Sequence, residues 1–169
     1  MQLKEIDKSL YSKRVKIVFG AIVLALLVLT LLFSTLFIQL FSTPQAPHFW
    51  QNLSGVVVAA FIVVWVMNKL RDHPWLNEVT YVWDLKQMLN RIYRKQKKIE
   101  AAAAQGDTDA LMIMNFQLRG SKQLYQLDDN TITLESLIPK LLENEQRMKQ
   151  ANLDIEQNSL DPLLLQKFG

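Results

Sequence analysis

Two long apolar runs dominate the first part of the chain. The stretch from Ile17 through Met67 contains no Lys, Arg, Asp or Glu, and its first run, Ile17 to Phe41, has no proline either. As a helix this run measures about 37 Å, enough to cross a hydrocarbon core of about 30 Å. The second run is rich in β-branched residues, but a backbone in lipid must satisfy its own hydrogen bonds, which favours helix. The pattern predicts transmembrane helices at 17–41 and 50–68.

The short segment 42–49 connects these predicted helices, so they must run antiparallel as a hairpin. This segment contains no Lys or Arg, whereas basic residues are frequent in 1–16 and after Met67. Under the positive-inside rule, 42–49 is a periplasmic loop, and the basic N-terminal segment 1–16 and the domain 69–169 are cytoplasmic. A cleavable signal peptide is the alternative, but its apolar core is typically about 7–15 residues long. We therefore expect a multi-pass protein of the bacterial inner membrane with both termini in the cytoplasm.

Small and aromatic residues of the hairpin have two predicted roles. Ser34, Gly55 and Ala59 are expected to allow close helix packing in the membrane, because small side chains let helix backbones approach each other. An ion or proton path along the polar residues of the first helix is the alternative, but no charged residue lies in mid-membrane. The aromatic residues expected to anchor the chain at the membrane interfaces are Trp50, Trp65, Trp75 and Tyr81.

Beyond the second apolar run the pattern becomes that of amphipathic helices. Apolar residues recur at a spacing of three to four from Leu85 to Ala103, which predicts one long helix from about 74 to 105. Gly106 is expected to end that helix, and Asp107 to cap the next one. Further helices are predicted at about 108–126, 134–151 and 161–168, with Pro139 in a first turn if the third begins near Ser136. The predicted fold is all-α: a two-helix transmembrane hairpin followed by a small cytoplasmic helical unit with one long amphipathic helix.

Charge is distributed unevenly along the chain. Residues 1–16 carry five basic and two acidic groups, 69–98 carry eight and three, and 99–169 carry six and eleven. The densest basic cluster consists of Arg91, Arg94, Lys95, Lys97 and Lys98. It is interpreted as a solvated helix face, or as a contact for anionic lipid or a protein partner. Nucleic acid is disfavoured because no recognised binding motif accompanies the charge.

The residues needed for catalysis or metal binding are missing from the pattern. The chain has no cysteine, and its two histidines, His48 and His73, are predicted on opposite sides of the membrane. The acidic run that starts at Asp128 lacks the spacing and the glycine of a calcium loop, so a turn with a helix cap is preferred. No phosphate-binding glycine loop or nucleophile elbow occurs. We expect no enzyme activity, no cofactor and no metal site.

Two stretches resemble a known family. They are Leu70-Arg-Asp-His-Pro74 continuing into Glu78-Val-Thr-Tyr-Val-Trp-Asp-Leu-Lys-Gln-Met-Leu-Asn-Arg-Ile-Tyr-Arg-Lys95, and Arg119-Gly-Ser-Lys-Gln-Leu-Tyr-Gln-Leu-Asp-Asp-Asn-Thr131. Both resemble a gammaproteobacterial family of small two-pass inner-membrane proteins known only as a domain of unknown function. The resemblance covers most of the chain. It implies an inner-membrane location and supplies no activity, partner or site residue.

Three functional hypotheses follow from these features. The first is a non-catalytic inner-membrane protein whose cytoplasmic helical domain binds a protein partner or a second copy of itself, because a long apolar stripe is combined with oppositely charged halves. The second is a module that lies on anionic lipid through the basic helix at 75–98. The third is a small accessory subunit of a transporter or channel. The lipid bilayer is a partner in all three.

Overall fold

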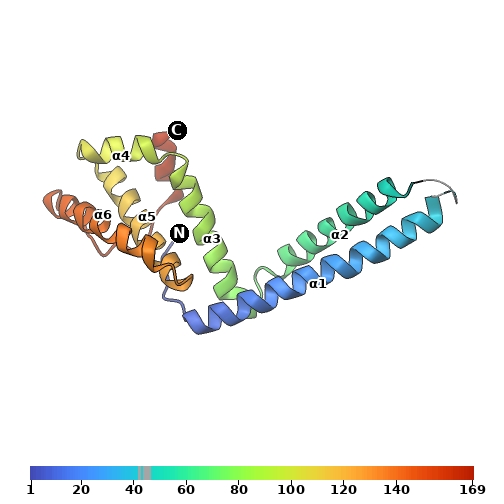
Figure 1. Cartoon of the computed structure of the whole chain (residues 1–169). Coiled ribbons are helices and arrows are strands. Elements are labelled where there is room, and N and C mark those ends of the chain that lie inside the picture. The colour runs from blue at the N-terminus through green and yellow to red at the C-terminus, as the bar shows by residue number, and fades with distance from the viewer. Residues whose placement is uncertain (42, 44–46) are drawn as a thin grey trace. The chain divides into compact units, whose positions relative to one another are not determined.

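The computed structural model describes residues 1–41, 43 and 47–169, and in this part of the chain the fold is all-α, as predicted (Figure 1). The described residues contain no strand, and their single β-type pairing is the antiparallel bridge between Gln2 and Ser159. The chain divides into two compact units. The hairpin unit is Ser9–Thr80, and the helical unit combines Met1–Lys8 with Tyr81–Gly169.

The hairpin unit contains helices α1 (Lys8–Phe41) and α2 (Phe49–Leu70), followed by the 3-10 turn η1 (Pro74–Leu76). Both α1 and α2 are long and apolar enough to cross a membrane. Helix α1 begins at Lys8, well before the apolar run, so residues 8–16 of the predicted N-terminal segment 1–16 are helical. Ser42 and residues 44–46 of the predicted loop 42–49 lie outside the described residues.

Helices α1 and α2 lie side by side and antiparallel (Figure 1), and they are in close contact at Gly55. A Cβ atom on Gly55 would lie 2.7 Å from the backbone nitrogen of Ser34 and 2.9 Å from its Cα. Ala59, one turn further along, is fully buried. The Ser34 hydroxyl donates to the Asn52 carbonyl at 3.4 Å, and the Thr35 hydroxyl donates to the Leu31 carbonyl at 2.7 Å. These two hydroxyls thus bond to helix backbones.

In the helical unit, one helix occupies the centre. The helices are α3 (Asn77–Tyr93), α4 (Gln96–Ala104), α5 (Thr108–Leu127) and α6 (Thr131–Gln150), followed by the 3-10 helix η2 (Pro162–Phe168). Helix α5 packs against α4, α6 and η2, and its residues Leu111, Ile113 and Phe116 are almost completely buried. Asp107 caps α5 as predicted, because its carboxylate accepts from the Ala110 N–H at 2.8 Å. Gly106 supplies the positive φ of 85° before the cap.

The predicted single helix from 74 to 105 is wrong, because the chain leaves the helical path at Arg94 and Lys95. Lys95 has φ −111° and ψ 6°, and its N–H donates to the Ile92 carbonyl at 2.9 Å. The resulting turn separates α3 from α4. Helix α3 packs by Leu85 and Leu89 on Gly120 of α5, and α4 also packs on α5. A straight helix would carry its second half away from this compact core, so tertiary packing overrides the continuous apolar period.

The predicted start of the third soluble helix is also wrong. Helix α6 begins at Thr131, not at 134 or near Ser136, and Pro139 lies inside it. Asn130 provides the reason, because its side-chain oxygen accepts from the Thr133 N–H at 3.2 Å and caps the helix. Pro139 has no N–H to donate to the Glu135 carbonyl, a loss that occurs on an exposed part of the helix.

The first residues of the chain pack into the helical unit, which the sequence did not predict. Leu3 N–H donates to the Asn158 carbonyl at 2.7 Å, and Leu160 N–H donates to the Met1 carbonyl at 2.8 Å. Nearby, the Tyr81 hydroxyl accepts from the Lys4 N–H and donates to the Gln123 side chain, both at 2.9 Å. The helical unit is therefore assembled from segments before and after the hairpin.

The Gly55 contact predicts the effect of adding a single methyl group. We expect Gly55→Ala to destabilise the purified protein by about 1–3 kcal/mol, the usual cost of overpacking, because the added methyl group would meet the hydroxyl and also the backbone of Ser34. Gly20→Ala is the matched control, since a Cβ there meets nothing within 4 Å. Unfolding of each variant in detergent, followed by circular dichroism, measures the effect. Equal stability of the two variants would contradict the close contact.

The bridge between Gln2 and Ser159 predicts a disulfide in a double-cysteine variant. The flanking bonds make these residues a non-hydrogen-bonded antiparallel pair, in which Cα atoms are about 4.5 Å apart and within disulfide range. Because the chain has no cysteine, Gln2→Cys with Ser159→Cys should form one intramolecular disulfide on mild oxidation of the purified protein. Peptide mapping detects it, and the single variants are controls. Dimers without an internal disulfide would show that the two segments are not paired.

Candidate functional site

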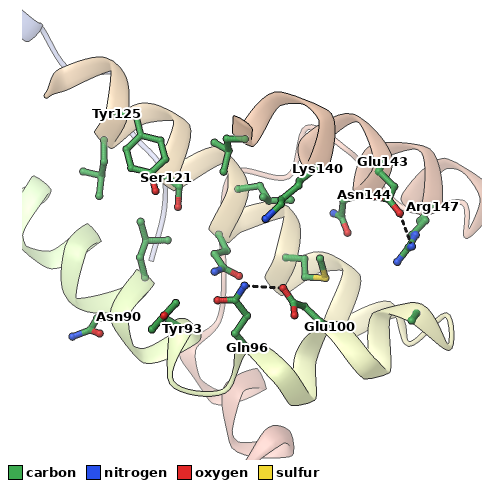
Figure 2. A pocket seen from close by; sticks show the side chains of 17 residues that line it. Asn90, Tyr93, Gln96, Glu100, Ser121, Tyr125, Lys140, Glu143, Asn144 and Arg147 are labelled. Atoms are coloured by element: carbon green, nitrogen blue, oxygen red, sulfur yellow. Dashed lines mark hydrogen bonds and ion pairs between the residues drawn. The ribbon is translucent and has the colours of Figure 1, made fainter. Parts of the chain in front are cut away.

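A groove of about 710 Å³ on the helical unit is a candidate site (Figure 2). Helices α3 and α4 line it on one side with Tyr93 and Gln96, and α6 lines the other with Lys140 and Asn144. Helix α5 lines it between them from Met114 to Tyr125, about 16 Å of helix. We call this the α5 groove. The break at Lys95 shapes it, because α3 and α4 contribute to its wall in different directions.

The apolar part of the α5 groove comes from aliphatic side chains that also belong to the core. Leu89, Leu118 and Leu124 are each less than one-tenth exposed and still border the groove. Tyr93 is different, because 68% of it is exposed. An exposed aromatic ring beside an apolar floor is typical of surfaces that bind protein segments.

Polar groups of the α5 groove include several that are paired within their own helix. The Gln96 side chain donates to Glu100 at 2.7 Å, and Arg147 forms an ion pair with Glu143 at the same distance. Asn144 is 2% exposed and donates to the Leu111 carbonyl at 3.2 Å, while its Oδ1 has no hydrogen-bond partner among the described residues.

Lys140 carries the positive charge of the groove that remains uncompensated. Its side chain is exposed, and no ion pair or hydrogen bond involves its ammonium in the part of the chain that the structure describes. Glu143 is already paired with Arg147. A cation at the edge of an apolar groove favours a ligand that combines an apolar face with an acidic group.

The predicted basic cluster is divided by the structure into two kinds of residue. Lys95 donates its ammonium to the Leu165 carbonyl at 2.8 Å, and Lys98 donates to the Gly169 carbonyl, so both bind the carbonyl end of η2. Arg91, Arg94 and Lys97 are exposed. Lys95 and Lys98 therefore take part in hydrogen bonds within the helical unit. Arg91, Arg94 and Lys97 present charge at its surface.

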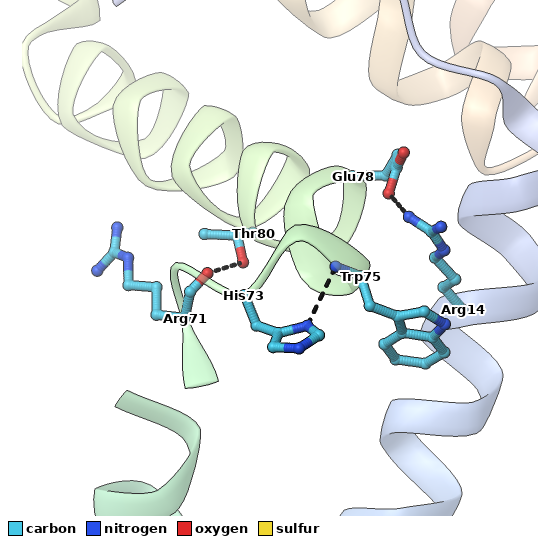
Figure 3. A network of polar contacts seen from close by, with 6 residues as sticks. All are labelled: Arg14, Arg71, His73, Trp75, Glu78 and Thr80. Carbon is cyan, nitrogen blue, oxygen red and sulfur yellow. Dashed lines mark hydrogen bonds and ion pairs between the residues drawn. The ribbon is translucent and has the colours of Figure 1, made fainter. Parts of the chain in front are cut away.

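Polar contacts at one end of the hairpin unit involve a predicted anchor residue, Trp75 (Figure 3). Arg14 forms an ion pair with Glu78, and its guanidinium lies 5.5 Å from the centre of the Trp75 ring. The His73 Nδ1 accepts from the Trp75 N–H at 3.2 Å and caps η1, with Pro74 in the first turn. The Arg14–Trp75 geometry is a cation–π contact.

The other predicted anchors lie in different environments. Trp50 and Trp65 on α2 are 71% and 61% exposed. Tyr81 instead has its hydroxyl in the hydrogen bonds to Lys4 and Gln123. Burial raises the pKa of the Tyr81 phenol, and these two hydrogen bonds partly offset that rise. Its hydroxyl therefore joins the N-terminal segment to α3 and α5.

The described residues hold no group of three or more His, Cys, Asp or Glu side chains that could bind a metal ion. Besides Tyr81, Lys167 has a shifted pKa. A hydrogen bond to Asp109 and the negative charge of Asp109 both raise the pKa of Lys167. This pair is at the surface and belongs to the contact between η2 and α5.

Sequence reasoning located the basic cluster but missed the α5 groove. The segment that becomes α5 was expected only as a helix at about 108–126, and the apolar period from Leu85 to Ala103 predicted one uninterrupted helix. The one available signal was the polar Gln96 within the apolar stripe, next to the site of the break.

Comparisons with known proteins identify one family. No curated protein and no solved structure matches the chain. A family model described as "Protein of unknown function (DUF3087)" matches residues 1–165, which is nearly the whole chain. The chain therefore belongs to this family of unknown function.

Proposed function

We propose that the chain is a non-catalytic, two-pass protein of the bacterial inner membrane that holds a helical protein-binding domain at the cytoplasmic face. The observation that carries the binding role is the α5 groove, with its apolar floor, exposed Tyr93 and uncompensated Lys140. Its occupant is an amphipathic helix of a partner protein with an acidic side chain opposite Lys140. The length of the groove, about 16 Å, accommodates about three helical turns.

The membrane part of this proposal is supported by the hairpin unit. Both α1 and α2 expose large apolar side chains around most of their surface, which is stable in lipid and costly in water. Residues 1–3 bond to residues 158–160, which supports a topology with both of these segments on the same side of the membrane. Two crossings satisfy this condition, and the basic residues flanking the hairpin favour the cytoplasm for that side.

A crosslinker placed in the groove tests the binding role. In native membranes, a photoreactive phenylalanine at Tyr93 should form an adduct with one partner protein. The matched control is Trp83, an aromatic residue of α3 that is 61% exposed and does not line the groove. Adding Lys140→Glu should reduce the Tyr93 adduct about tenfold or more, because it places like charges opposite each other. Lys149→Glu, outside the groove on the same helix, should leave it unchanged.

The products of this experiment separate the proposal from its alternatives, and gels with mass spectrometry identify them. Equal adduct yields from Tyr93 and Trp83, or no adduct from Tyr93, would contradict a partner in the groove. An adduct of twice the chain's mass would show that the occupant of the groove is a second copy of the chain rather than another protein.

A further inference from the structure

A second groove, of about 420 Å³, lies within the hairpin unit between α1 and α2. On α1 it extends from Ile17 to Leu29, and on α2 from Ile62 to Leu70. Its lining is apolar except at one end, where His73 and Trp75 border it. We call it the interhelix groove. It lies at the opposite end of the helix pair from the tight contact at Gly55.

The interhelix groove exists because small residues replace large ones on the facing side of α1. Ala21 and Ala25 are one turn apart and both line the groove. At Gly55 the two helices are in contact, whereas a groove borders Ala21 and Ala25. The result is an apolar channel along the helix pair, about 18 Å long on α1. One leaflet of a bilayer has a hydrocarbon thickness of about 15 Å, half of the core.

Basic residues follow the same helix faces beyond the end of the groove. Arg14 precedes the lining residue Val18 by four positions, and Lys13 precedes Ile17 by four, so both continue the α1 face. Lys69 follows Val66 by three positions and continues the α2 face. Arg71 is excluded from this group, because Figure 3 shows its guanidinium pointing away from His73 and Trp75.

His73 adds a directed hydrogen-bond donor at the same end. Its Nδ1 accepts the Trp75 N–H, so the neutral imidazole carries its proton on Nε2. The groove end thus combines one N–H donor, the basic groups of Lys13, Arg14 and Lys69, and an amphipathic indole. Glu78 neutralises only Arg14 among them.

We propose that the interhelix groove binds one anionic phospholipid, with an acyl chain between α1 and α2 and the phosphate at the His73 end. The apolar length matches a single leaflet, and the charge at the end is complementary to a phosphodiester. Basic pockets between transmembrane helices on the cytoplasmic side are a recurrent form of lipid recognition. This inference rests on the membrane part of the proposed function, and it is independent of the α5 groove.

Quenching of Trp75 by brominated lipid tests the site in the full-length chain. Trp50→Phe, Trp65→Phe and Trp83→Phe leave Trp75 as the single tryptophan. In vesicles of phosphatidylcholine containing a small fraction of brominated lipid, brominated phosphatidylglycerol should quench Trp75 more strongly than brominated phosphatidylcholine does. Removing one basic residue, as in Lys69→Gln, should lower this preference about fivefold. Lys97→Gln, in the helical unit, is the charge-matched control.

A filled groove provides the second comparison. Ala25→Leu places a larger side chain in the groove and keeps the helix apolar, so it should abolish the preference for phosphatidylglycerol. Ala60→Leu adds the same volume at an exposed position of α2 outside the groove and should preserve it. Equal quenching by the two brominated lipids, or equal loss in both leucine variants, would overturn the lipid site.

Two further measurements separate this inference from its rivals. Alkaline extraction reports membrane anchoring on its own. If the protein resists extraction but shows no lipid preference, the proposed membrane anchor stands and the lipid site is contradicted. If alkaline extraction releases the protein, both the membrane anchor and the lipid site are contradicted.

Because the chain has no cysteine, Ala25→Cys also reports on a second copy in the groove. A dimer linked by a disulfide at this position would show that the groove is occupied by a second copy of the chain rather than by lipid. The absence of such a dimer agrees with lipid as the occupant.

Discussion

The pairing of Met1–Leu3 with residues 158–160 is the constraint on which the remaining structure depends. Two backbone hydrogen bonds and the Gln2–Ser159 bridge close the chain into a loop, so the hairpin becomes an insertion within a single helical unit. Tyr81 and Gln123 strengthen this closure by bonding to Lys4. A simple anchor would leave its first residues free, whereas here they complete the core of the helical unit beside Gly120.

The features of the fold that depend on local chemistry could be predicted from the sequence. Apolar length identified α1 and α2, and the caps at Asp107 and Asp161 marked where helices begin. The features that depend on distant contacts could not. Neither Arg94 nor Lys95 is a glycine or a proline, the residues that usually end a helix. The break at these two residues follows instead from packing against α5. Residues 1–3 contain no strand signal, because two backbone bonds are too few to leave a sequence period.

The same distinction applies to the two candidate sites. The basic residues were visible in the sequence as a cluster. The structure is needed to distinguish Lys95 and Lys98, which bind the carbonyl end of η2, from Arg91, Arg94 and Lys97. Both grooves are invisible in the sequence because they are spaces between elements, set by where helices separate. Small residues were expected to aid packing and Gly55 lies in close contact with Ser34, yet the small residues Ala21 and Ala25 line a groove.

Closure of the chain on itself also has a consequence for biosynthesis. Met1 leaves the ribosome long before Leu160, which pairs with it and lies 159 positions later in the chain. The hairpin is translated long before residue 158, so under the proposed membrane topology the hairpin inserts before the helical unit assembles. Such a long sequence separation slows folding, since a large loop must close before the contact forms. Until then, the faces of α3 and α5 that later pack against the first residues remain open to chaperones and proteases.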